Sequence, residues 1–528
     1  MPTELKPAVN PWLIAVTVTL ATFMELLDTS IANVSLPYIG GGLGRSYDEV
    51  TWILTTYLVA NAVVLPMSAW LSRVLGRKNY YLACVALFTL TSLFCGLAPT
   101  LGFMLSGRVL QGIAGGGLAP VAQAILVDTF PAAKRASAFA LYTIVIVTAP
   151  AIGPVLGGWI TDNYSWRWIF FINIPIGIVA FFLSSRLLQD PPAFAAERAT
   201  VRTGGKLTVD GLGITLIALA SATLEVALDR GQIEDWFGST FICWMLGIAA
   251  VGWIATIFWE MRVKEPVIDF RLLASRNFAI SNVLFFVFGL GLFGSTTLIP
   301  QMLQSLYGYR AIDAGLVLGP GALVITLLAP IGAQLIQRRI VHPRVLIAIS
   351  LTTVAAAMWH YSTFNLATDY RHFALARAYQ GLGYGFFFVP VNIIAYSQLR
   401  PDQNNRASSL TNFFRNWGGS FGIALITTAA ERRRDFHQTN VGSAIGSTSQ
   451  QLVERARALT DYLVGKGFTG PDAAAAANAG LLGQLQRQVS LLAFMDCFRI
   501  IAWVTLATVP LILLVRHFKN AAPAPGAH

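Results

Sequence analysis

Charged residues are scarce in this chain. Only 12% of its 528 residues are Asp, Glu, Lys or Arg, whereas 55% are hydrophobic and the mean hydropathy is +0.60. Soluble domains carry about a quarter charged residues, so this composition excludes an ordinary soluble protein and indicates many membrane spans. The net charge of +11 does not indicate a nucleic-acid partner, because the basic residues lie in short clusters between apolar runs, as in membrane loops.

Cysteines and catalytic motifs are also scarce. The four cysteines, Cys84, Cys95, Cys243 and Cys497, lie in or beside apolar stretches and show neither metal-ligand spacing nor a disulfide framework. The chain has no phosphate-binding loop with a Walker A lysine, and no pairing of a nucleophile with a base. We therefore expect no enzyme activity, no metal site and no cofactor, and a source of energy other than ATP hydrolysis by this chain.

Apolar windows of about 20 residues, long enough to cross a bilayer, recur along the chain. We place fourteen spans near residues 12–37, 48–72, 79–98, 102–129, 136–160, 168–188, 209–228, 240–260, 277–303, 313–336, 345–363, 372–397, 406–430 and 491–517. An even number of spans puts both termini on the same side of the membrane.

Lysines and arginines are distributed unevenly between the loops. The loops on the side of the termini hold most of them, including the basic residues of 73–78, 134–135, 186–206, 262–276 and 338–344. The opposite short loops hold Arg45, Arg167, Arg230, Arg310 and Arg371. Since basic loops stay inside, this bias predicts that both termini are cytoplasmic.

The chain repeats itself weakly at half its length. Segment 108–120 begins Arg-Val-Leu-Gln-Gly and ends in proline. Segment 377–390 begins Arg-Ala-Tyr-Gln-Gly and also ends in proline, so the arginine, glutamine, glycine and proline recur. A second match, Arg-Ala-Ser, starts at residues 135 and 406, so the offsets are 269 to 271 residues. We predict an all-α integral membrane fold of two six-helix, pseudo-symmetric halves plus two inserted helices. The predicted divisions are an N-terminal half at 1–188, a cytoplasmic linker with the two inserted helices at 189–260, and a C-terminal half at 261–528 with an extracytoplasmic helical loop at 431–490.

Two acids stand in the first span. Glu25 and Asp28 are three residues apart and therefore share one helix face. A carboxyl group in mid-membrane costs several kcal/mol unless it faces a cavity or a partner, so it is a functional candidate by default. A shallow helix whose acids reach the lipid headgroups is the alternative. We interpret the two acids as a proton-coupling pair that repel each other and titrate as a unit.

Cations and polar groups recur inside other spans. Arg108, which either snorkels to the interface or faces the acids, is the third candidate for proton coupling. Arg377 is its counterpart in the second half. Aromatic and polar residues at intramembrane positions are candidates for lining a substrate cavity, although each one alone is more often a packing residue. The full set is Asn33, Tyr57, Gln111, Tyr142, Trp359, Arg377, Gln380, Tyr384, Asn412, Phe413, Arg415 and Trp417.

Small residues and prolines are concentrated in the fifth span. Its segment Pro150-Ala-Ile-Gly153-Pro154 continues to Gly157 and Gly158, a pattern that permits close helix contact and removes backbone hydrogen bonds. Tight packing explains part of this pattern, and bending during alternating access is the functional interpretation. The turn at Gly76 and Arg77 is either a topology signal or a latch between cytoplasmic helix ends.

Several motifs together resemble one transporter family. They are LATFMELLDTSIANVSLP at 20–37, RVLQGIAGGG at 108–117, AP-x-x-GP-x-x-GG at 149–158, WRWIFFINIPIG at 166–177, LDRGQIEDWF at 228–237 and SRNF at 275–278. The chain resembles the fourteen-span drug:proton antiporters of the major facilitator superfamily, and among them the EmrB-type multidrug exporters. In this resemblance Asp28 matches the family aspartate. Arg73, where an aspartate is usual, and Glu25, where we expect a neutral residue, depart from the pattern.

The resemblance implies the major facilitator fold and proton-driven export of amphipathic, cationic small molecules without a cofactor. It also implies a bacterial inner membrane, a periplasmic adaptor (membrane fusion protein) and an outer-membrane channel as partners. An exporter dedicated to one endogenous metabolite or lipid would use the same fold. A non-transporting sensor or scaffold would tolerate neutral residues at Glu25 and Asp28 and would need a soluble output domain, for which the tails 1–11 and 518–528 are too short.

Overall fold

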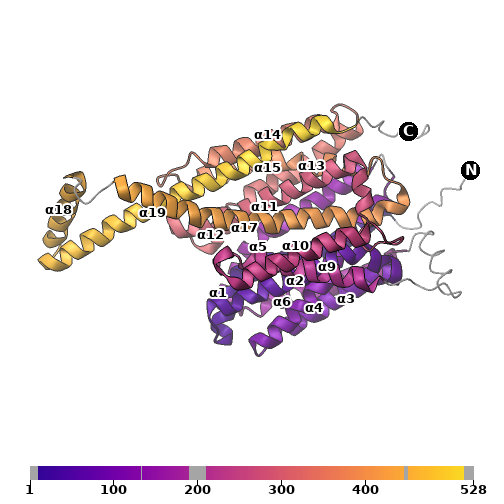
Figure 1. Ribbon diagram of the computed structural model, residues 1–528, viewed down its shortest axis with the longest axis horizontal. Helices are drawn as coiled ribbons and strands as arrows, with labels where there is room; N and C mark the ends of the chain where they lie inside the picture. Colours follow the sequence, from indigo (N-terminus) through magenta and orange to yellow (C-terminus); the bar gives the residue numbers. More distant parts are fainter. Residues whose placement is uncertain (1–9, 132–133, 190–209, 445–449, 517–528) are drawn as a thin grey trace, which may run out of the picture.

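The computed structural model is helical throughout the residues that it describes, which are 10–131, 134–189, 210–444 and 450–516. Most of the predicted linker and the basic residues of both tails lie outside these ranges. The helices run side by side along the long axis of the molecule (Figure 1). We call the end where α1 begins and η4 stops the terminal end, on the right in Figure 1.

Long apolar helices form the N-terminal part. They are α1 (Pro11–Leu43), α2 (Tyr47–Leu75), α3 (Arg77–Gly96), α4 (Leu101–Thr129), α5 (Arg135–Asn163), α6 (Trp168–Phe171) and α7 (Asn173–Leu187). Their ends follow local signals: the Asn10 side chain accepts a hydrogen bond from the Trp12 amide (3.0 Å), and Ser46 and Glu49 form a capping box. Gly44 closes α1 in the left-handed conformation (φ 64°).

Two further helices follow the linker. They are α9 (Gly211–Arg230) and α10 (Thr240–Glu260), joined through η1 (Trp236–Gly238) and followed by η2 (Phe270–Ala274). The Asp210 side chain caps α9 by accepting from the Gly213 amide (2.8 Å), and it also accepts from Trp259 Nε1 (2.8 Å). This one carboxyl group therefore joins the start of α9 to the end of α10.

The C-terminal part contains the remaining helices. They are α11 (Arg276–Tyr307), α12 (Ala311–Leu316), α13 (Gly319–Gln337), α14 (Pro343–Tyr361), α15 (Tyr370–Gly385), α16 (Phe388–Tyr396), η3 (Pro401–Gln403), α17 (Asn404–Ala444), α18 (Gln450–Gly465), α19 (Gly470–Ala507) and η4 (Val509–Leu514). α18 and the adjoining ends of α17 and α19 project beyond the bundle, opposite the terminal end (Figure 1). The described residues of the predicted loop, 431–444 and 450–490, are thus largely helical, and α18 within them lies outside the bundle.

Twelve helices of the described residues are long and apolar enough to cross a membrane. The other two predicted spans, 372–397 and 406–430, coincide with α15 and α16 and with α17. Residues 386–387 separate α15 from α16, so each of these two helices is too short to cross a membrane by itself. α17 is long enough, but it holds too many polar residues to count as an apolar span. The all-helical fold is confirmed, whereas the count of fourteen stays a prediction.

The same helix pairings occur in both parts of the chain. α1 packs on α5 as α11 packs on α17, and α2 packs on α4 as α13 packs on α15. α3 contacts α4 and α7, and α14 correspondingly contacts α15 and α19. These pairings agree with an internal duplication. Where the two parts meet, α5 packs on α12 and α13, and α17 packs on α2 and α4.

The contact between α1 and α5 depends on the prolines of α5. Pro154 has no amide hydrogen, so the carbonyl of Pro150, four residues earlier, lacks its helical partner. Ser30 of α1 donates its hydroxyl to this carbonyl (3.0 Å). A side chain of one helix therefore replaces the hydrogen bond that proline removed from the other.

Replacing Ser30 by alanine should lower the free energy of unfolding by about 0.6–1 kcal/mol, because one interhelical hydrogen bond within the membrane is lost. Thermal unfolding in detergent measures this change. Ser106→Ala is the matched control, since the Ser106 hydroxyl bonds only within α4 (Gly102 O, 3.0 Å) and its loss should change little. Equal effects of the two substitutions would contradict the assigned role of Ser30.

Candidate functional site

Asp28 lies at the centre of a buried polar network. Its carboxyl group receives hydrogen bonds from Arg108 Nη1 (2.6 Å), Gln111 Nε2 (3.1 Å) and Asn173 Nδ2 (2.6 Å). Ser92 Oγ accepts from Gln111 (2.8 Å) and from Asn173 (3.3 Å). One acid on α1 is thereby connected to side chains on α3, α4 and α7.

Arg108 is fully buried and contacts other groups besides the Asp28 carboxylate. Its Nε donates to the Ile53 carbonyl of α2 (3.1 Å), and its guanidinium lies 4.3 Å from the centre of the Tyr57 ring. The snorkelling alternative for Arg108 is therefore wrong in this structure. A buried ion pair is stable only when its remaining groups are well paired. Here α2, α4 and α7 supply partners for the pair, and Arg108 Nη2 is the atom of its guanidinium left without a hydrogen bond among the described residues.

Glu25 has different neighbours from Asp28, although both are buried on α1. Its Oε1 accepts from Asn61 Nδ2 of α2 (3.2 Å), and its Oε2 has no hydrogen-bond partner among the described residues. Arg415 of α17 lies near enough to act electrostatically on Glu25 and on Tyr142. Glu25 thus has a hydrogen bond to its own half and an electrostatic interaction with Arg415 of the second half, whereas the hydrogen-bond partners of Asp28 all belong to the first half.

The second half repeats the network without an acid. Arg377 donates to Gln380 Oε1 (2.5 Å), Ser295 Oγ (3.2 Å) and Thr296 Oγ1 (3.1 Å), and Gln380 donates to Ser295 (2.9 Å). Ser295 therefore stands on α11 where Asp28 stands on α1. Tyr384 is buried one turn beyond Gln380. Arg108 and Gln111 act on a titratable group, and their counterparts act on hydroxyls.

A chain of amides joins the halves. Asn412 Nδ2 donates to Gln123 Oε1 (2.5 Å), and Gln123 Nε2 donates to Asn392 Oδ1 (2.6 Å). Gln123 and Asn392 are 269 residues apart, which is the repeat offset of Arg108 and Arg377. The repeat could have predicted this contact, because equivalent positions of two related halves can meet near their pseudo-symmetry axis.

The other residues predicted to line the substrate cavity lie at separate places in the structure. Phe413 and Trp417 pack on Trp253 of α10, with ring centroids 5.5 Å and 4.7 Å away. Trp359 is half exposed and packs edge-on against Trp503 (5.8 Å), and Asn33 is exposed on α1. Helical position alone did not distinguish central from peripheral faces, so a single cavity formed by all twelve residues is not what this structure contains.

Two functional residues were missed by the sequence reasoning. Asn173 stands in the motif at 166–177 without an assigned role of its own, and Ser92 was not singled out. Each is a small polar residue within an apolar run, and this was the available signal. Nothing in their own segments indicated that Asn173 bonds to Asp28, or that Ser92 accepts hydrogen bonds from the two amides that do, Gln111 and Asn173.

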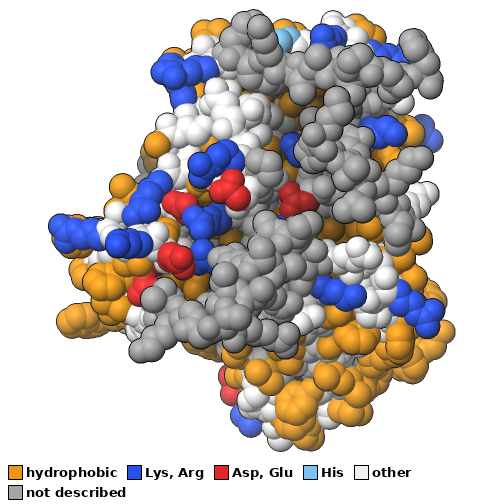
Figure 2. Space-filling view, turned by 90° about the vertical axis from the view of Figure 1, so that its right-hand side faces the viewer, with side chains coloured by type: hydrophobic (Ala, Val, Ile, Leu, Met, Phe, Trp, Pro, Cys, Tyr) orange, Lys and Arg blue, Asp and Glu red, His pale blue; other side chains and the backbone are white. Residues whose placement is uncertain are grey.

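The turn at Gly76 lies at the terminal end, where φ is 84°. The next residue, Arg77, pairs with Asp128 of α4 (2.5 Å), which also accepts from Asn404 of α17 (2.7 Å). These contacts join the turn to α4 and α17, and the interpretation of the turn as a latch stays a prediction. Arg73 pairs separately with Glu265 (3.7 Å). Figure 2 shows charged side chains gathered on this face.

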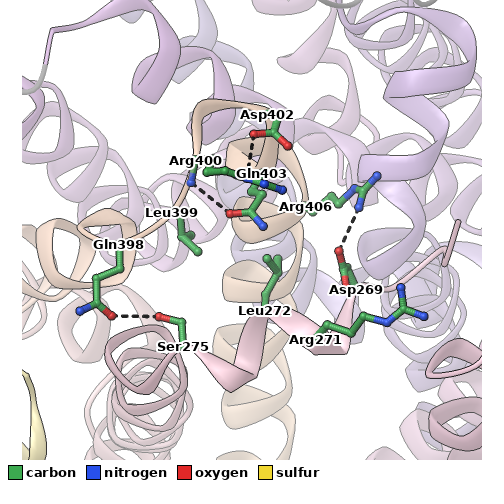
Figure 3. Close-up of a pocket in the computed structure, with 10 residues that line it drawn as sticks. All are labelled: Asp269, Arg271, Leu272, Ser275, Gln398, Leu399, Arg400, Asp402, Gln403 and Arg406. Atoms are coloured by element: carbon green, nitrogen blue, oxygen red, sulfur yellow. Dashed lines mark hydrogen bonds and ion pairs between the residues drawn. The ribbon is translucent and has the colours of Figure 1, made fainter. Parts of the chain in front are cut away.

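A polar pocket of about 400 Å³ opens near the terminal end, between η2 and the start of α17. Arg406 points to Asp269 across it (2.9 Å), and Ser275 hydrogen bonds to Gln398 (3.2 Å) (Figure 3). The described residues hold no cluster of His, Cys, Asp and Glu suited to a metal ion.

Comparisons with known proteins agree with this architecture. The Major Facilitator Superfamily matches residues 18–423. The multidrug export protein EmrB of Escherichia coli is 33% identical over 99% of this chain and 100% of its own length. The fatty acid resistance protein FarB of Neisseria gonorrhoeae is 36% identical over 88% and 89%. The human organic anion transporter MFSD10 has a similar fold, with a TM-score of 0.59 and 11% identity over 96% of this chain and 100% of its own.

Proposed function

Because this chain belongs to the Major Facilitator Superfamily, we propose that it is a proton-coupled antiporter that exports amphipathic drugs and other toxic compounds from the cytoplasm. The ion pair of Asp28 and Arg108, buried without water contact, is the observation that carries this proposal. It places a titratable group in the membrane with a cation and two amides that can hold it in its charged form. The multidrug export function of its relative EmrB supports the choice of substrates.

In this mechanism a proton from the outer side neutralises Asp28. Arg108 then loses its charged partner and keeps its bonds to Ile53 and Gln111, so the α1–α4 contact weakens and the halves can rearrange. Release of the proton inside restores the ion pair. Moving one charge across ~100 mV supplies about 2.3 kcal/mol, which changes a two-state equilibrium substantially.

Glu25 has a second role in the proposal. It lies between the halves near Arg415 and Tyr142, with one carboxyl oxygen unpaired among the described residues. This position suits an acid that receives a cationic substrate and exchanges it for a proton. Proton coupling then involves both acids, with Asp28 responsible for the conformational response and Glu25 for competition between substrate and proton.

The proposed setting is a bacterial inner membrane with both termini in the cytoplasm. The basic loops at the terminal end support this orientation. The proposal includes a periplasmic adaptor and an outer-membrane channel as partners, as the resemblance implies. In this orientation α18 and the adjoining helix ends project into the periplasm, where an adaptor would be.

Substrate-triggered proton movement in proteoliposomes tests the proposal. Asp28→Asn should abolish proton movement, because the titrating group is lost, whereas Glu25→Gln should retain it with an altered pH optimum. Asp369→Asn, at an exposed loop position, is the matched control and should behave as wild type. Full proton-coupled efflux in Asp28→Asn would refute the coupling role of this residue.

An exporter of one lipid class is the second candidate. The 36% identity to a fatty acid resistance protein favours it. Buried Arg415, which forms no ion pair among the described residues, could receive a carboxylate at the position assigned above to cationic substrates. Competition in the same proteoliposomes decides between the candidates: fatty acids and cationic drugs should each be tested for inhibition of the other's efflux.

A further inference from the structure

The inserted helices α9 and α10 contact both halves of the protein. α9 packs on α2 of the first half and on α17 of the second (Figure 1). α10 adds Trp253, which packs against Phe413 and Trp417 of α17. A pair of helices in this position either moves with one half or resists the separation of the two.

The bonds from α9 to α2 are ionic and polar. Asp229 accepts a hydrogen bond from the Thr55 hydroxyl. The adjacent Arg230 donates to Thr51 Oγ1 (2.7 Å), and its guanidinium lies 4.8 Å from the centre of the Trp52 ring. These three contacts within about one turn of α2, together with the packing of α9 along α2, make α9 an attachment of the first half.

The contacts of α9 with α17 are fewer and depend on an acid. Ser420 Oγ donates to Glu225 Oε1 (2.8 Å), and Trp236 Nε1, just beyond α9, donates to Thr428 Oγ1 (2.8 Å). Glu225 is only 3% exposed. It lies one turn before Asp229, so one face of α9 binds one half through Asp229 and the other half through Glu225.

The groups that face Glu225 carry no positive charge. On its own helix the nearest titratable group is Asp229, and α17 presents the Ser420 hydroxyl. α2 presents hydroxyls to Asp229 and Arg230, and α10 presents Gly252 to Ala220 of α9. Arg230 pairs instead with Glu234 (3.4 Å). Ionising Glu225 here would leave a charge in the membrane without a cation, which costs several kcal/mol unless water enters.

We propose that α9 and α10 are carried by the first half and hold the second half through a contact that opens when Glu225 loses its proton. Proton loss draws water to the carboxylate and separates α9 from α17 at Ser420 and Thr428. Proton uptake restores the contact. This inference rests on the proposed antiport, to which it adds a third proton-linked group, on the inserted helix α9 and therefore outside the two six-helix halves.

Cysteine cross-linking in the full-length protein tests the contact directly, after replacement of the four native cysteines. Trp236→Cys with Thr428→Cys reports on the distance between α9 and α17 while Glu225 stays intact. Thr55→Cys with Asp229→Cys reports on the attachment to α2. Because thiol reactivity itself rises with pH, the yield of the first pair is divided by the yield of the second.

From about pH 6 to about pH 8, this ratio should fall about fivefold, as expected for a modest coupling energy between protonation and conformation. Glu225→Gln should remove the pH dependence, since an amide keeps the bond to Ser420 and cannot ionise. Glu234→Gln, an exposed acid of the same segment, should leave the pH dependence intact. An unchanged ratio across this pH range, or a pH dependence that persists in Glu225→Gln, would overturn the proposal.

A functional measurement completes the test. Cross-linking the α9–α17 pair should stop efflux reversibly, whereas cross-linking the α9–α2 pair should not. If both cross-links stop efflux, or if neither does, α9 is not an attachment of the first half and the proposal fails. The cross-linking yields need no transport, so failure of the antiport proposal would be recognised separately.

Discussion

Arg108→Ala should lower the free energy of unfolding by about 3–5 kcal/mol, the cost of leaving one member of a buried ion pair without its partner. Arg108 is fully buried, and its removal deprives Asp28 of the 2.6 Å hydrogen bond and the only ion pair that the described residues provide for it. The Ile53 carbonyl and Gln111 lose partners as well. Thermal and denaturant unfolding in detergent measure the loss.

Two further variants separate charge from packing. Asp28→Asn combined with Arg108→Ala should be more stable than Arg108→Ala alone, because the uncompensated acid has been removed. Arg377→Ala is the matched control in the second half, where the arginine binds hydroxyls and an amide and no acid loses its partner. Its cost should be about 1–3 kcal/mol. If Arg377→Ala proved as costly as Arg108→Ala, packing would account for both.

Gly153→Ala should destabilise the protein by about 1–3 kcal/mol and reduce transport sharply, because α1 and α5 touch at this glycine. A β-carbon at residue 153 would lie 2.4 Å from Ser30 Cβ, which no side-chain rotation relieves. The two helices would have to move apart. This separation would also break the bond from Ser30 to the Pro150 carbonyl.

Gly158→Ala is the comparison within the same motif. A β-carbon at residue 158 meets nothing within 4 Å, and alanine is favoured over glycine in a helix by up to about 1 kcal/mol. This variant should therefore be neutral or slightly more stable, with normal efflux. Stability is read from thermal unfolding, and efflux from the proteoliposome assay. Equal losses at residues 153 and 158 would mean that the motif acts through flexibility rather than through helix contact.

Much of the site could be predicted because intramembrane polar residues are costly and therefore few. Glu25, Asp28 and Arg108 were recognisable from their positions in apolar runs, and the repeat related Arg108 to Arg377. Their hydrogen-bond partners were harder to predict from the sequence. Asn173 bonds to Asp28, and Ser92 joins the network through Asn173, only because α3 and α7 pack beside α1 and α4. Neither residue differs locally from a tolerated polar residue in a span.

For the two acids, helical spacing predicts that they share a face of α1, but it does not predict which residues each of them contacts. Three residues of separation place Glu25 and Asp28 on one face of α1, as predicted. That face meets α2 at Glu25, and it meets α4 and α7 at Asp28, so the two acids acquire different partners. Phe413 and Trp417 illustrate the same limit, because their face of α17 meets α10 instead of a cavity.

The sequence by itself determined that the chain is a helical membrane protein, where its apolar helices lie, and which side chains are too costly to be there by chance. These are properties of single segments, since hydrophobic length, and the cost of leaving a charge unpaired in the bilayer, can be judged from one segment without its neighbours. Only the tertiary structure decided that Asp28 pairs with Arg108, that Glu25 bonds instead to Asn61, and that Gly153 but not Gly158 is a point of contact. Helical periodicity assigns a residue to a face of its own helix, and packing alone decides what that face meets.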